Sequence, residues 1–317
     1  MNLLSLYYFV ELAKELHVTN VAQRLYISQQ NLSQHIQRLE HFYGVELFYR
    51  KPRLALTYAG EQLYAAAIKI LAEESDFVNR LSSISKKRAG NLKIGIPAYR
   101  GQICLPDILS RFHKLWPNVS IQLIDKASEK MEEMVRDGEL DFYIGVIHPN
   151  SAQLDILPLL DDSVFLVCSD ELLKRYYTDS CEELKKRSRK GANLKWFSHV
   201  PFLLPEPRMR LRKLIDECFL DAKVTPEIFL ESSSTELLIS LYPNHYGAFF
   251  CTQMRLPLLA ASAPDANTFP MILKGEFVQH HIGLVRHKDR FLPDYVNDFI
   301  EITKDVFHEI SNIRIQS

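Results

Sequence analysis

The sequence predicts an α/β protein with an all-α winged helix-turn-helix domain at its N-terminus. Two short amphipathic segments between residues 18 and 40 are spaced as the helices of a helix-turn-helix. Residues 58–87 contain no proline and repeat apolar side chains every three or four positions, which indicates one long helix. From residue 90 onward, short apolar runs alternate with amphipathic segments, as in a parallel sheet with helical crossovers.

The helix-turn-helix prediction starts from two hydroxyl residues, each followed by a helical segment. Thr19 and Ser28 stand where a side-chain oxygen can cap a helix N-terminus. Ala22 and Leu25 would be buried by the first helix, and only two residues separate Leu25 from the second cap, so the helices must turn sharply. The second helix would bury one apolar face, made by Leu32, Ile36 and Leu39.

The outer face of the second helix is polar, as expected of a surface that reads DNA. Its side chains suit base edges and phosphates, and they are Gln29, Gln30, Ser33, Gln34, Gln37 and Arg38. An ordinary helical hairpin with a polar outside would explain the two helices equally well. The next segment favours the DNA reader, because two short apolar runs flank a basic turn with Arg50, Lys51 and Arg53. Such a turn is typical of a wing that touches the DNA backbone.

The long helix carries an apolar seam with heptad spacing and one acidic interruption. The seam consists of Leu63, Ala67, Ile70, Glu74, Phe77, Leu81 and Ile84. A helix of about 30 residues spans about 45 Å and cannot bury such a seam on its own small domain. We interpret it as a dimerisation helix, because helix-turn-helix proteins usually bind two half-sites as dimers. Packing against the C-terminal part of the same chain is the alternative.

The C-terminal part predicts alternating strands and helices. Strands are expected at residues 91–96, 119–124, 141–146, 157–160, 164–168, 202–204, 228–230, 248–251 and 282–285. Helices are expected around residues 105–115, 131–135, 171–177, 208–219, 234–241 and 294–310. Residues 161–163 separate two of the strands, and residues 185–190 predict a basic surface loop. About 225 residues of this kind suffice for two lobes.

Bulk composition describes an ordinary globular protein. The net charge of −1 by itself argues nothing about nucleic acid. Residues 1–90 carry 11 Lys/Arg and 8 Asp/Glu, a mild excess of +3, so any DNA affinity would rest on local placement of cations rather than on a broad basic field. Five scattered cysteines without a CxxC motif predict a reduced, cytoplasmic chain. No apolar run approaches the roughly 18 residues of a membrane span, and the N-terminus lacks a signal peptide, so no membrane partner is expected.

Several short motifs occur in a fixed order along the chain. They are the helix at 6–16, Val21-Ala22-Gln23-Arg24-Leu25, Ser28-Gln29 with Leu32-Ser33, Gly44-Val45-Glu46-Leu47-Phe48, and Leu56-Thr57-Tyr58-Ala59-Gly60. Weaker signals follow at 92–96, 138–145 and 232–235. Together these motifs resemble the LysR-type transcriptional regulators over essentially the whole chain.

The resemblance implies three parts and a regulatory function. They are a winged helix-turn-helix domain at 1–57, a linker dimerisation helix at 58–89 and an effector-binding domain at 90–317. The last would consist of two Rossmann-like lobes resembling periplasmic binding proteins, lobe 1 at about 90–161 and 269–317 and lobe 2 at about 162–268. The chain would cross between the lobes near Asp161 and Thr268. A small-molecule effector, often an organic anion, would bind between the lobes and change how a homodimer or homotetramer sits on an imperfect palindrome in promoter DNA. RNA polymerase is a further candidate partner.

The resemblance also suggests the residues that contact DNA. They are Thr19, Ser28, Gln29, Gln30, Ser33, Gln34, Arg38, Arg50 and Arg53. The family usually has proline or a small residue near Gln30 and often arginine near Gln34. Glutamine stands at both positions here, so a charge that attracts phosphate is replaced by neutral hydrogen bonding. A further departure precedes the strand at 248–251, where His245 and Tyr246 could narrow the ligand cleft.

The predicted effector site lies at two helix N-termini. Its residues are Ala98, Tyr99, Arg100, Ser232, Ser233, Thr235 and Tyr246. Backbone N–H groups and hydroxyls at helix starts suit a carboxylate, and strand ends are where open α/β sheets bind ligands. Arg100 could add a charge-assisted hydrogen bond. The alternative is that the serines only cap the helix and Arg100 faces solvent.

No motif indicates catalysis, a metal or a cofactor. The sequence lacks G-x-S-x-G, H-E-x-x-H and a glycine-rich phosphate loop. His280 and His281 are adjacent on a predicted strand, so they point to opposite faces and cannot share a metal. Cys104 lies near the predicted cleft without an evident resolving partner, which disfavours a redox switch. A second hypothesis assigns the chain to a different functional class. It would be a ligand-binding or enzymatic α/β protein whose N-terminal domain contacts other proteins.

Overall fold

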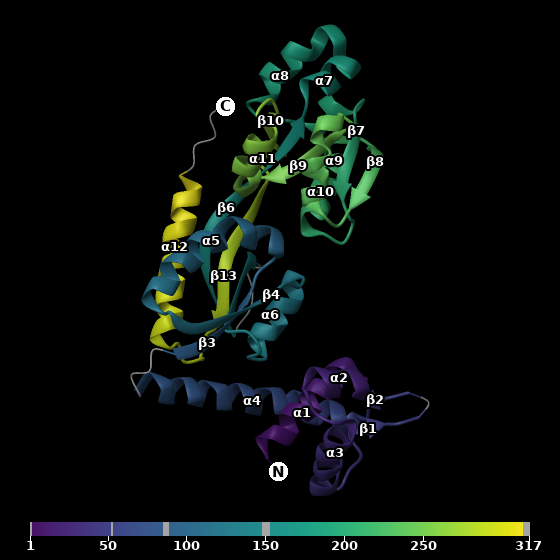
Figure 1. Cartoon of the computed structure of the whole chain (residues 1–317). Helices are drawn as coiled ribbons and strands as arrows, with labels where there is room; N and C mark the ends of the chain where they lie inside the picture. The colour runs from purple at the N-terminus through teal and green to yellow at the C-terminus, as the bar shows by residue number, and fades with distance from the viewer. Residues whose placement is uncertain (1, 52, 85–88, 148–152, 313–317) are drawn as a thin grey trace.

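A computed structural model describes the chain except for residues 1, 52, 85–88, 148–152 and 313–317. Figure 1 shows a small N-terminal domain, one long helix, and a two-lobed α/β body. The long helix α4 (Tyr58–Ile84) runs beneath the lobes and carries the N-terminal domain along its first turns. The predicted fold class, α/β with an N-terminal winged helix-turn-helix, is confirmed.

The N-terminal domain is a three-helix unit with a two-stranded wing. Its elements are α1 (Leu3–Glu15), α2 (Val18–Arg24), α3 (Gln29–Tyr43), β1 (Phe48–Tyr49) and β2 (Ala55–Leu56). The core is formed by one apolar face of each helix and by the start of α4. It includes Leu6, Phe9, Val21, Leu32, Ile36, Leu39 and Ala67. The wing strands pair antiparallel, Phe48 with Leu56 and Tyr49 with Ala55.

The two predicted helix caps have different outcomes. Ser28 caps α3 as predicted, and its Oγ accepts a hydrogen bond from Asn31 N at 3.1 Å. Thr19 does not cap α2, because the helix already begins at Val18 and Thr19 lies inside its first turn. The cap is His17, whose Nδ1 accepts from Asn20 N at 3.3 Å. α1 is followed by its C-cap residue Leu16, whose backbone is left-handed (φ 53°). The chain therefore changes direction two residues before Val18.

The seam of α4 is covered only at its start. Ala67 is fully buried against the N-terminal domain, and Leu63 packs beside it. Further along the helix, Ile70, Phe77 and Leu81 are 37%, 59% and 48% exposed. The side chain of Ile84 lies outside what the structure describes. Among the described residues, no helix is both long and apolar enough to cross a membrane.

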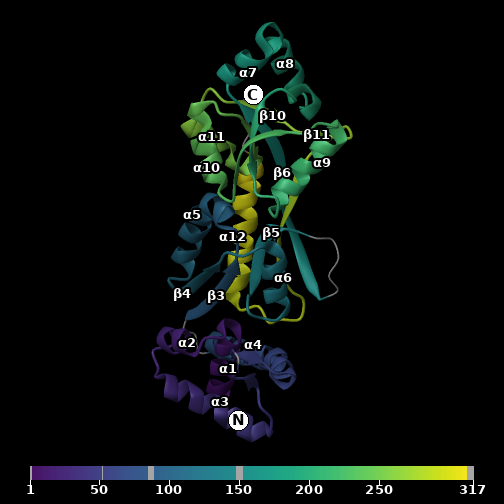
Figure 2. The same cartoon turned by 90° about the vertical axis from the view of Figure 1, so that its right-hand side faces the viewer.

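Lobe 1 is a five-stranded layer with helices on both faces. Its strands are β4 (Asn118–Ile124), β3 (Ala89–Gly95), β5 (Phe142–Val146), β13 (Gln279–His287) and the first part of β6 (Leu154–Cys168), in that spatial order. Its helices are α5 (Ala98–Leu115), α6 (Ser128–Arg136) and α12 (Asp294–Ser311). Figure 2 shows α5 and α6 on different sides of this sheet.

Lobe 2 continues the same sheet beyond β6. Its strands β9 (Ala248–Thr252), β7 (Pro201–Pro205) and β8 (Glu227–Ser232) follow β6 in that order, and β10 (Asn267–Pro270) pairs with the other edge of β6. Its helices are α7 (Asp170–Tyr177), α8 (Cys181–Ser188), α9 (Arg210–Ala222), α10 (Thr235–Ser240) and α11 (Leu256–Ser262). A small hairpin, β11 (Ile272–Leu273) and β12 (Glu276–Phe277), completes it.

The strand that joins the lobes corrects two predictions. Residues 157–160 and 164–168 belong to one continuous strand, because Asp161, Asp162 and Ser163 pair with β13 instead of turning. The second crossing does not lie near Thr268, since residues 267–270 pair with β6 inside lobe 2. Met271 and Val278 still belong to the lobe 2 core, so the chain returns to lobe 1 only where β13 begins.

The predicted basic loop at 185–190 is wrong. Residues 185–188 form the end of α8, and Lys185 is buried. The Lys185 ammonium lies 2.6 Å from Asp170 Oδ1 and 2.9 Å from Glu182 Oε1. These two ion pairs explain why a charged residue can be buried at this position.

The core of lobe 1 is organised by three phenylalanine rings. The Phe299 ring of α12 lies 5.1 Å from Phe112 of α5 and 5.5 Å from Phe142 of β5. All three side chains are essentially inaccessible to solvent. This cluster fixes both helices to the sheet through contacts between segments that are far apart in sequence.

Phe299→Ala is expected to lower the free energy of unfolding by about 3–5 kcal/mol, because it opens a cavity in this cluster. Urea-induced unfolding followed by circular dichroism would measure the loss. The matched control is Phe277→Ala, since that ring is 56% exposed and its removal should cost less than about 1 kcal/mol. Equal losses in the two variants would contradict the proposed role of the cluster.

Candidate functional site

The outer face of α3 presents the polar residues predicted to read DNA. Gln29, Gln30, Gln34 and Arg38 are exposed, and Ser33 is half-buried between them. The inner face is fixed by Ser5 Oγ of α1, which lies 2.8 Å from the buried His35 Nδ1. The structure therefore brings five of the predicted residues together on one solvent-facing surface.

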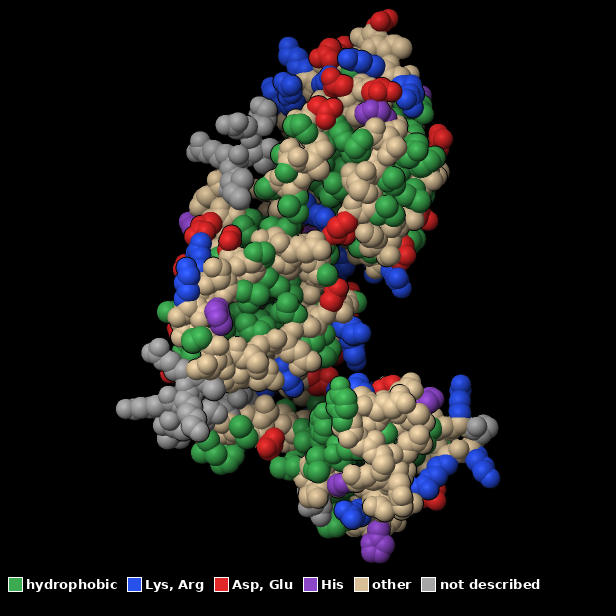
Figure 3. All heavy atoms as spheres, viewed as in Figure 1, with side chains coloured by type: hydrophobic (Ala, Val, Ile, Leu, Met, Phe, Trp, Pro, Cys, Tyr) green, Lys and Arg blue, Asp and Glu red, His purple; other side chains and the backbone are tan. Residues whose placement is uncertain are grey.

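The wing places its cations beside this surface in two different ways. Arg50 is held by α3, because its Nη2 donates to Glu40 Oε2 at 2.9 Å. Glu40 Oε1 in turn accepts from Leu47 N at 3.0 Å, which ties the start of the wing to the helix. Lys51 and Arg53 are exposed, and Figure 3 shows basic side chains projecting around the tip of the wing.

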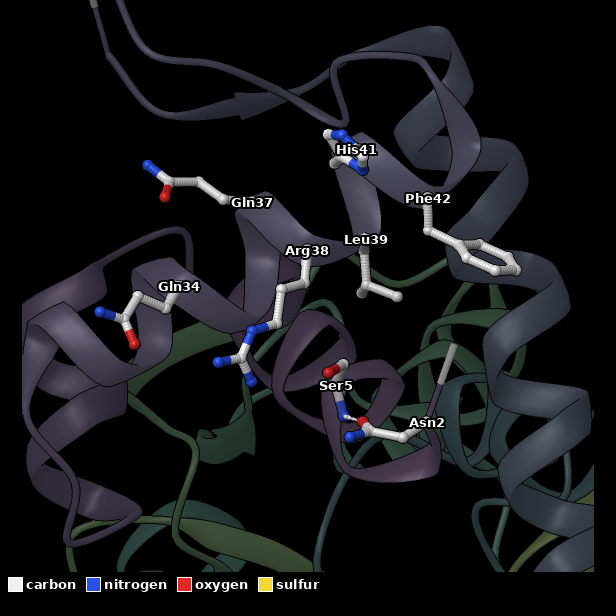
Figure 4. A pocket seen from close by; sticks show the side chains of 8 residues that line it. All are labelled: Asn2, Ser5, Gln34, Gln37, Arg38, Leu39, His41 and Phe42. Carbon is white, nitrogen blue, oxygen red and sulfur yellow. Dashed lines mark hydrogen bonds between the residues drawn. The ribbon is translucent and has the colours of Figure 1, made fainter.

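A hollow of about 630 Å³ opens between the start of α1 and the outer face of α3. Figure 4 shows Gln34, Gln37 and Arg38 extending along one side, with Asn2 and Ser5 of α1 opposite. Asn2 Oδ1 accepts from Ser5 N at 2.7 Å and caps α1. The lining offers hydrogen-bonding groups and a cation, so the hollow belongs to the same polar surface as the reading face.

One exposed aromatic residue near this surface was missed from the sequence. Tyr26 lies in the turn between α2 and α3 with φ 55°, and its side chain is 96% exposed. Its backbone N–H bonds to Gln23 O at 3.1 Å. A tyrosine in a left-handed turn position is unusual. The sequence signal that could have identified it is its place in the two-residue turn between Leu25 and the cap Ser28.

A cleft of about 620 Å³ lies between the two lobes. Figure 3 shows charged side chains gathered at the waist of the molecule where the lobes meet. Of the predicted effector residues, Ala98, Tyr99, Ser233 and Thr235 line this cleft. Cationic side chains in the lining are Lys126, Arg208, Arg210 and Arg255, and the acidic ones are Asp125, Glu129 and Glu236.

The helices α5, α6, α9 and α10 all begin at the cleft wall. In α5, α6 and α9 no side chain caps the helix start, so the first backbone N–H groups keep their donor capacity. The fourth helix, α10, is capped by Ser234, whose side chain accepts from Leu237 N at 3.2 Å. Uncapped helix starts carry partial positive charge, which makes the cleft suitable for an anion.

Two arginines of lobe 2 reach into the cleft. Arg210 Nη2 lies 3.0 Å from Glu129 Oε1 of lobe 1, and its Nη1 donates to Val146 O at 3.1 Å. Arg255 is buried, donates to Thr235 Oγ1, and pairs with Glu236 Oε1 at 3.0 Å. Neither was identified from the sequence, although Arg210 lies in the first turn of the helix predicted at residues 208–219 and that position was a usable signal.

Arg100 lies beneath the cleft and outside its lining, and it is only 1% exposed, so the alternative in which it faces solvent is wrong. Its Nη2 donates to Tyr99 Oη at 3.1 Å, while Nε and Nη1 have no partner among the described residues. The Tyr99 ring lies between two guanidinium groups, 5.0 Å from Arg100 and 5.9 Å from Arg255. Cation–π contacts therefore fix the aromatic wall of the cleft.

A buried acid and a buried histidine lie at the cleft, and the histidine, His280, is one of its lining residues. Asp162 of β6 and His280 of β13 are cross-strand partners, and Asp162 Oδ1 accepts from Met254 N at 2.9 Å. Burial raises the pKa of Asp162. Burial, with Arg100 and Arg210 nearby, lowers the pKa of His280 to about 4, so this imidazole is neutral near pH 7. His281 points the other way and lies 2.7 Å from Asp161, which confirms the predicted opposite orientations.

Two predicted effector residues lie elsewhere. Tyr246 stacks on Phe229 with ring centroids 4.9 Å apart, and neither ring lines the cleft. His245 bonds to Ser169 Oγ at 2.8 Å, so neither bulky residue narrows the cleft as expected. Ser232 Oγ accepts from Ser234 N at 3.0 Å, and this local turn keeps it out of the lining.

In the described part of the chain, the geometry supports neither redox chemistry at Cys104 nor a metal site. Burial raises the pKa of the Cys104 thiol to about 12, which disfavours the reactive thiolate. Within that part, no group of three His, Cys, Asp or Glu side chains is arranged to hold a metal ion.

Comparison with known proteins gives the same picture for both parts of the chain. Residues 3–61 match the family model described as bacterial regulatory helix-turn-helix protein, lysR family, and residues 85–308 match LysR substrate binding domain. The chain is 27% identical over 307 residues to the uncharacterized HTH-type transcriptional regulator YwbI of Bacillus subtilis, covering 96% of each protein. It is 35% identical over 170 residues to the Hca operon transcriptional activator HcaR of Escherichia coli, covering 53% of this chain and 56% of that protein.

Solved structures share the fold over the full length. A full-length single-residue variant of OxyR from Pseudomonas aeruginosa has a TM-score of 0.69 at 20% identity, covering 100% of this chain and 98% of that one. Full-length CbnR in complex with its target DNA has a TM-score of 0.62 at 19% identity, covering 96% and 100%. The two family models, which cover residues 3–61 and 85–308, establish that the chain belongs to the LysR family of transcriptional regulators, whose members are regulators and not enzymes.

Proposed function

We propose that this regulator binds an imperfect palindrome in promoter DNA as a homodimer, and that a small organic anion in the interlobe cleft modulates the binding. The observation that carries the DNA-binding half is the exposed polar face of α3 beside a wing with Lys51 and Arg53. A related fold, that of CbnR, has been solved with its target DNA. Because such a regulator acts on the chromosome, we place its action in the cytoplasm.

The proposed contacts divide into base reading and backbone binding. Gln29, Gln30, Ser33 and Gln34 offer neutral donors and acceptors that suit base edges in the major groove. Arg53, Lys51 and Arg38 are exposed cations that suit phosphates. Arg50 is the weaker candidate, since Glu40 already neutralises it. Ser28 and Thr19 are proposed to touch the backbone at the starts of α3 and α2.

The proposed dimer uses the distal part of α4. Ile70, Phe77 and Leu81 repeat at heptad positions and remain substantially exposed on this chain. Burial of such a seam against a second copy would remove apolar surface from water. A two-fold dimer presents two copies of α3, which is why the expected target has two half-sites. A tetramer would require a further interface.

The anionic class of the effector follows from the cleft. Three uncapped helix starts and two arginines, Arg210 and Arg255, line it, and the buried Arg100 lies directly below. Tyr99 supplies an aromatic wall, and Ser233 and Thr235 supply hydroxyls. This lining favours a small organic acid with an apolar body.

Genome-wide mapping of DNA fragments bound by the purified protein, with and without metabolite extract, tests the function as a whole. A small set of sites sharing an imperfect palindrome is the expected result, and the extract should change their occupancy. Diffuse binding without a shared site would contradict the proposal.

Gln29→Ala is expected to weaken specific binding more than nonspecific binding, because it removes a base contact worth about 1–3 kcal/mol. Fluorescence anisotropy on a mapped site and on random DNA of equal length would measure both affinities. An equal loss on the two DNAs would mean that Gln29 does not read bases.

Arg53→Ala is expected to weaken binding to both DNAs and to reduce the salt slope of the affinity by about 2, because the dimer loses one phosphate contact in each subunit. The matched control is Arg175→Ala, which removes an exposed arginine of lobe 2 paired with Glu171. Should the control lower the salt slope as much, the wing would not be the backbone contact.

Carboxylic acids are expected to raise the melting temperature of the protein, whereas the corresponding neutral amides should not. Arg255→Gln should weaken the binding of any such acid about thirtyfold, since a charge-assisted hydrogen bond contributes roughly 2 kcal/mol. Arg286→Gln in lobe 1 is the control, because its partner Asp155 lies outside the cleft lining. Amides that stabilise the protein as strongly as the acids would refute an anion site.

A further inference from the structure

We propose that helix α6 couples the effector cleft to the DNA-binding domain within a single chain. The proposal rests on the proposed function, since it assigns a physical route between the two proposed sites. Its first residues line the cleft, and the turn that follows its last residue contacts the N-terminal domain. Figures 1 and 2 both show α6 on the side of lobe 1 that faces α4.

The cleft end of α6 is held by a contact that spans both lobes. Glu129, in the first turn of α6, pairs with Arg210, the first residue of α9 in lobe 2. The same guanidinium donates to Val146 O at the end of β5. Arg210 thus joins lobe 2 to two elements of lobe 1. Arg210 Nη2 makes no hydrogen bond among the described residues, so it can donate to an anion in the cleft, whose negative charge would weaken the ion pair with Glu129.

The other end of α6 contacts the N-terminal domain through residues 137–140. Glu139 Oε1 lies 3.1 Å from Lys14 Nζ of α1. Gly138 adopts φ +75°, and a β-carbon there would lie only 2.6 Å from Ala72 Cβ of α4, so the two backbones are in close contact. Burial, with the negative charges of Glu139 and Asp137, raises the pKa of Tyr64 of α4 to about 12.

The turn is also anchored to lobe 1. Arg290 Nη1 donates to Gly138 O and to Leu140 O, both at 3.1 Å. These bonds fix the conformation that presents Gly138 and Glu139 to the N-terminal domain. A displacement of lobe 1 therefore moves the contact with α1 and α4 directly.

The body of α6 is rigid enough to carry such a displacement. Met131 and Val135 are fully buried against the sheet, in a cluster with Tyr143 of β5 and Val285 of β13. Nine helical residues span about 13 Å, and a packed helix transmits a shift along its axis with little internal deformation. Loss of the Arg210–Glu129 pair at one end should therefore be detectable at the other end.

Hydrogen exchange on the full-length protein tests the route directly. Arg210→Ala is expected to accelerate amide exchange in α6 and, at least about twofold, in the α1 segment 12–16 next to Lys14. The control Arg175→Ala, which removes an ion pair within α7, should leave both segments unchanged. Acceleration confined to residues lining the cleft would overturn the proposal.

A double-mutant cycle then measures the coupling on DNA. Arg210→Ala and Glu139→Gln are combined, and the affinity for a mapped site is measured for all four proteins. The two effects are expected to depart from multiplicativity by at least about threefold, because Glu139→Gln breaks the route that carries the effect of Arg210. The pair Arg175→Ala and Glu139→Gln should be multiplicative. Multiplicative effects for Arg210 as well would overturn the proposal.

The exchange measurement and the double-mutant cycle together distinguish failure of the route through α6 from failure of the proposed function. A wild-type protein that bound no DNA site specifically would refute the DNA-binding proposal, and the exchange measurement would still decide the route. Specific DNA binding with an unresponsive α1 segment would refute the route alone.

Discussion

The antiparallel pairing of β6 with β13 is the constraint on which the rest of the molecule depends. The two strands pair along their length from one lobe toward the other, and β6 is shared by the sheets of both lobes. Backbone hydrogen bonds fix this pairing whatever side chains surround it. The lobes are therefore joined by a two-stranded ribbon that can bend or twist without breaking either core.

The position of the cleft follows from this ribbon. The parallel strands of each lobe, β3 with β4 and β7 with β8, are followed by α5, α6, α9 and α10, whose starts face the junction between the lobes. Charged and polar groups collect there because helix starts, strand ends and both crossing strands meet at one place. Asp162 and His280 belong to the two strands of this ribbon. The side chains that surround the cleft therefore also surround the joint between the lobes.

The parts of this structure that depend on neighbouring residues were predictable from sequence. The serine cap of α3, its two faces and the wing follow from spacing within about ten residues. Contacts between distant segments were not predictable in this way. The start of α2 depends on how α1 ends at Leu16, and the continuity of β6 through Asp161, Asp162 and Ser163 depends on β13, more than 100 residues later. Tyr246 was misplaced because its partner Phe229 belongs to another strand, and Arg255 was missed because Thr235 and Glu236 lie on a different helix.

The ion pair between Arg50 and Glu40 has a consequence for how the regulator finds its targets. Arg38 is the one Lys or Arg in α3, and Glu40 neutralises the first cation of the wing. Arg38, Lys51 and Arg53 stay exposed, and a two-fold dimer carries two copies of each, so binding to phosphates remains dependent on salt. Glu40 removes one cation per subunit from this set, which weakens the attraction to arbitrary sequences without abolishing it. A larger share of the regulator should therefore be left to occupy its promoters than if Arg50 were unpaired.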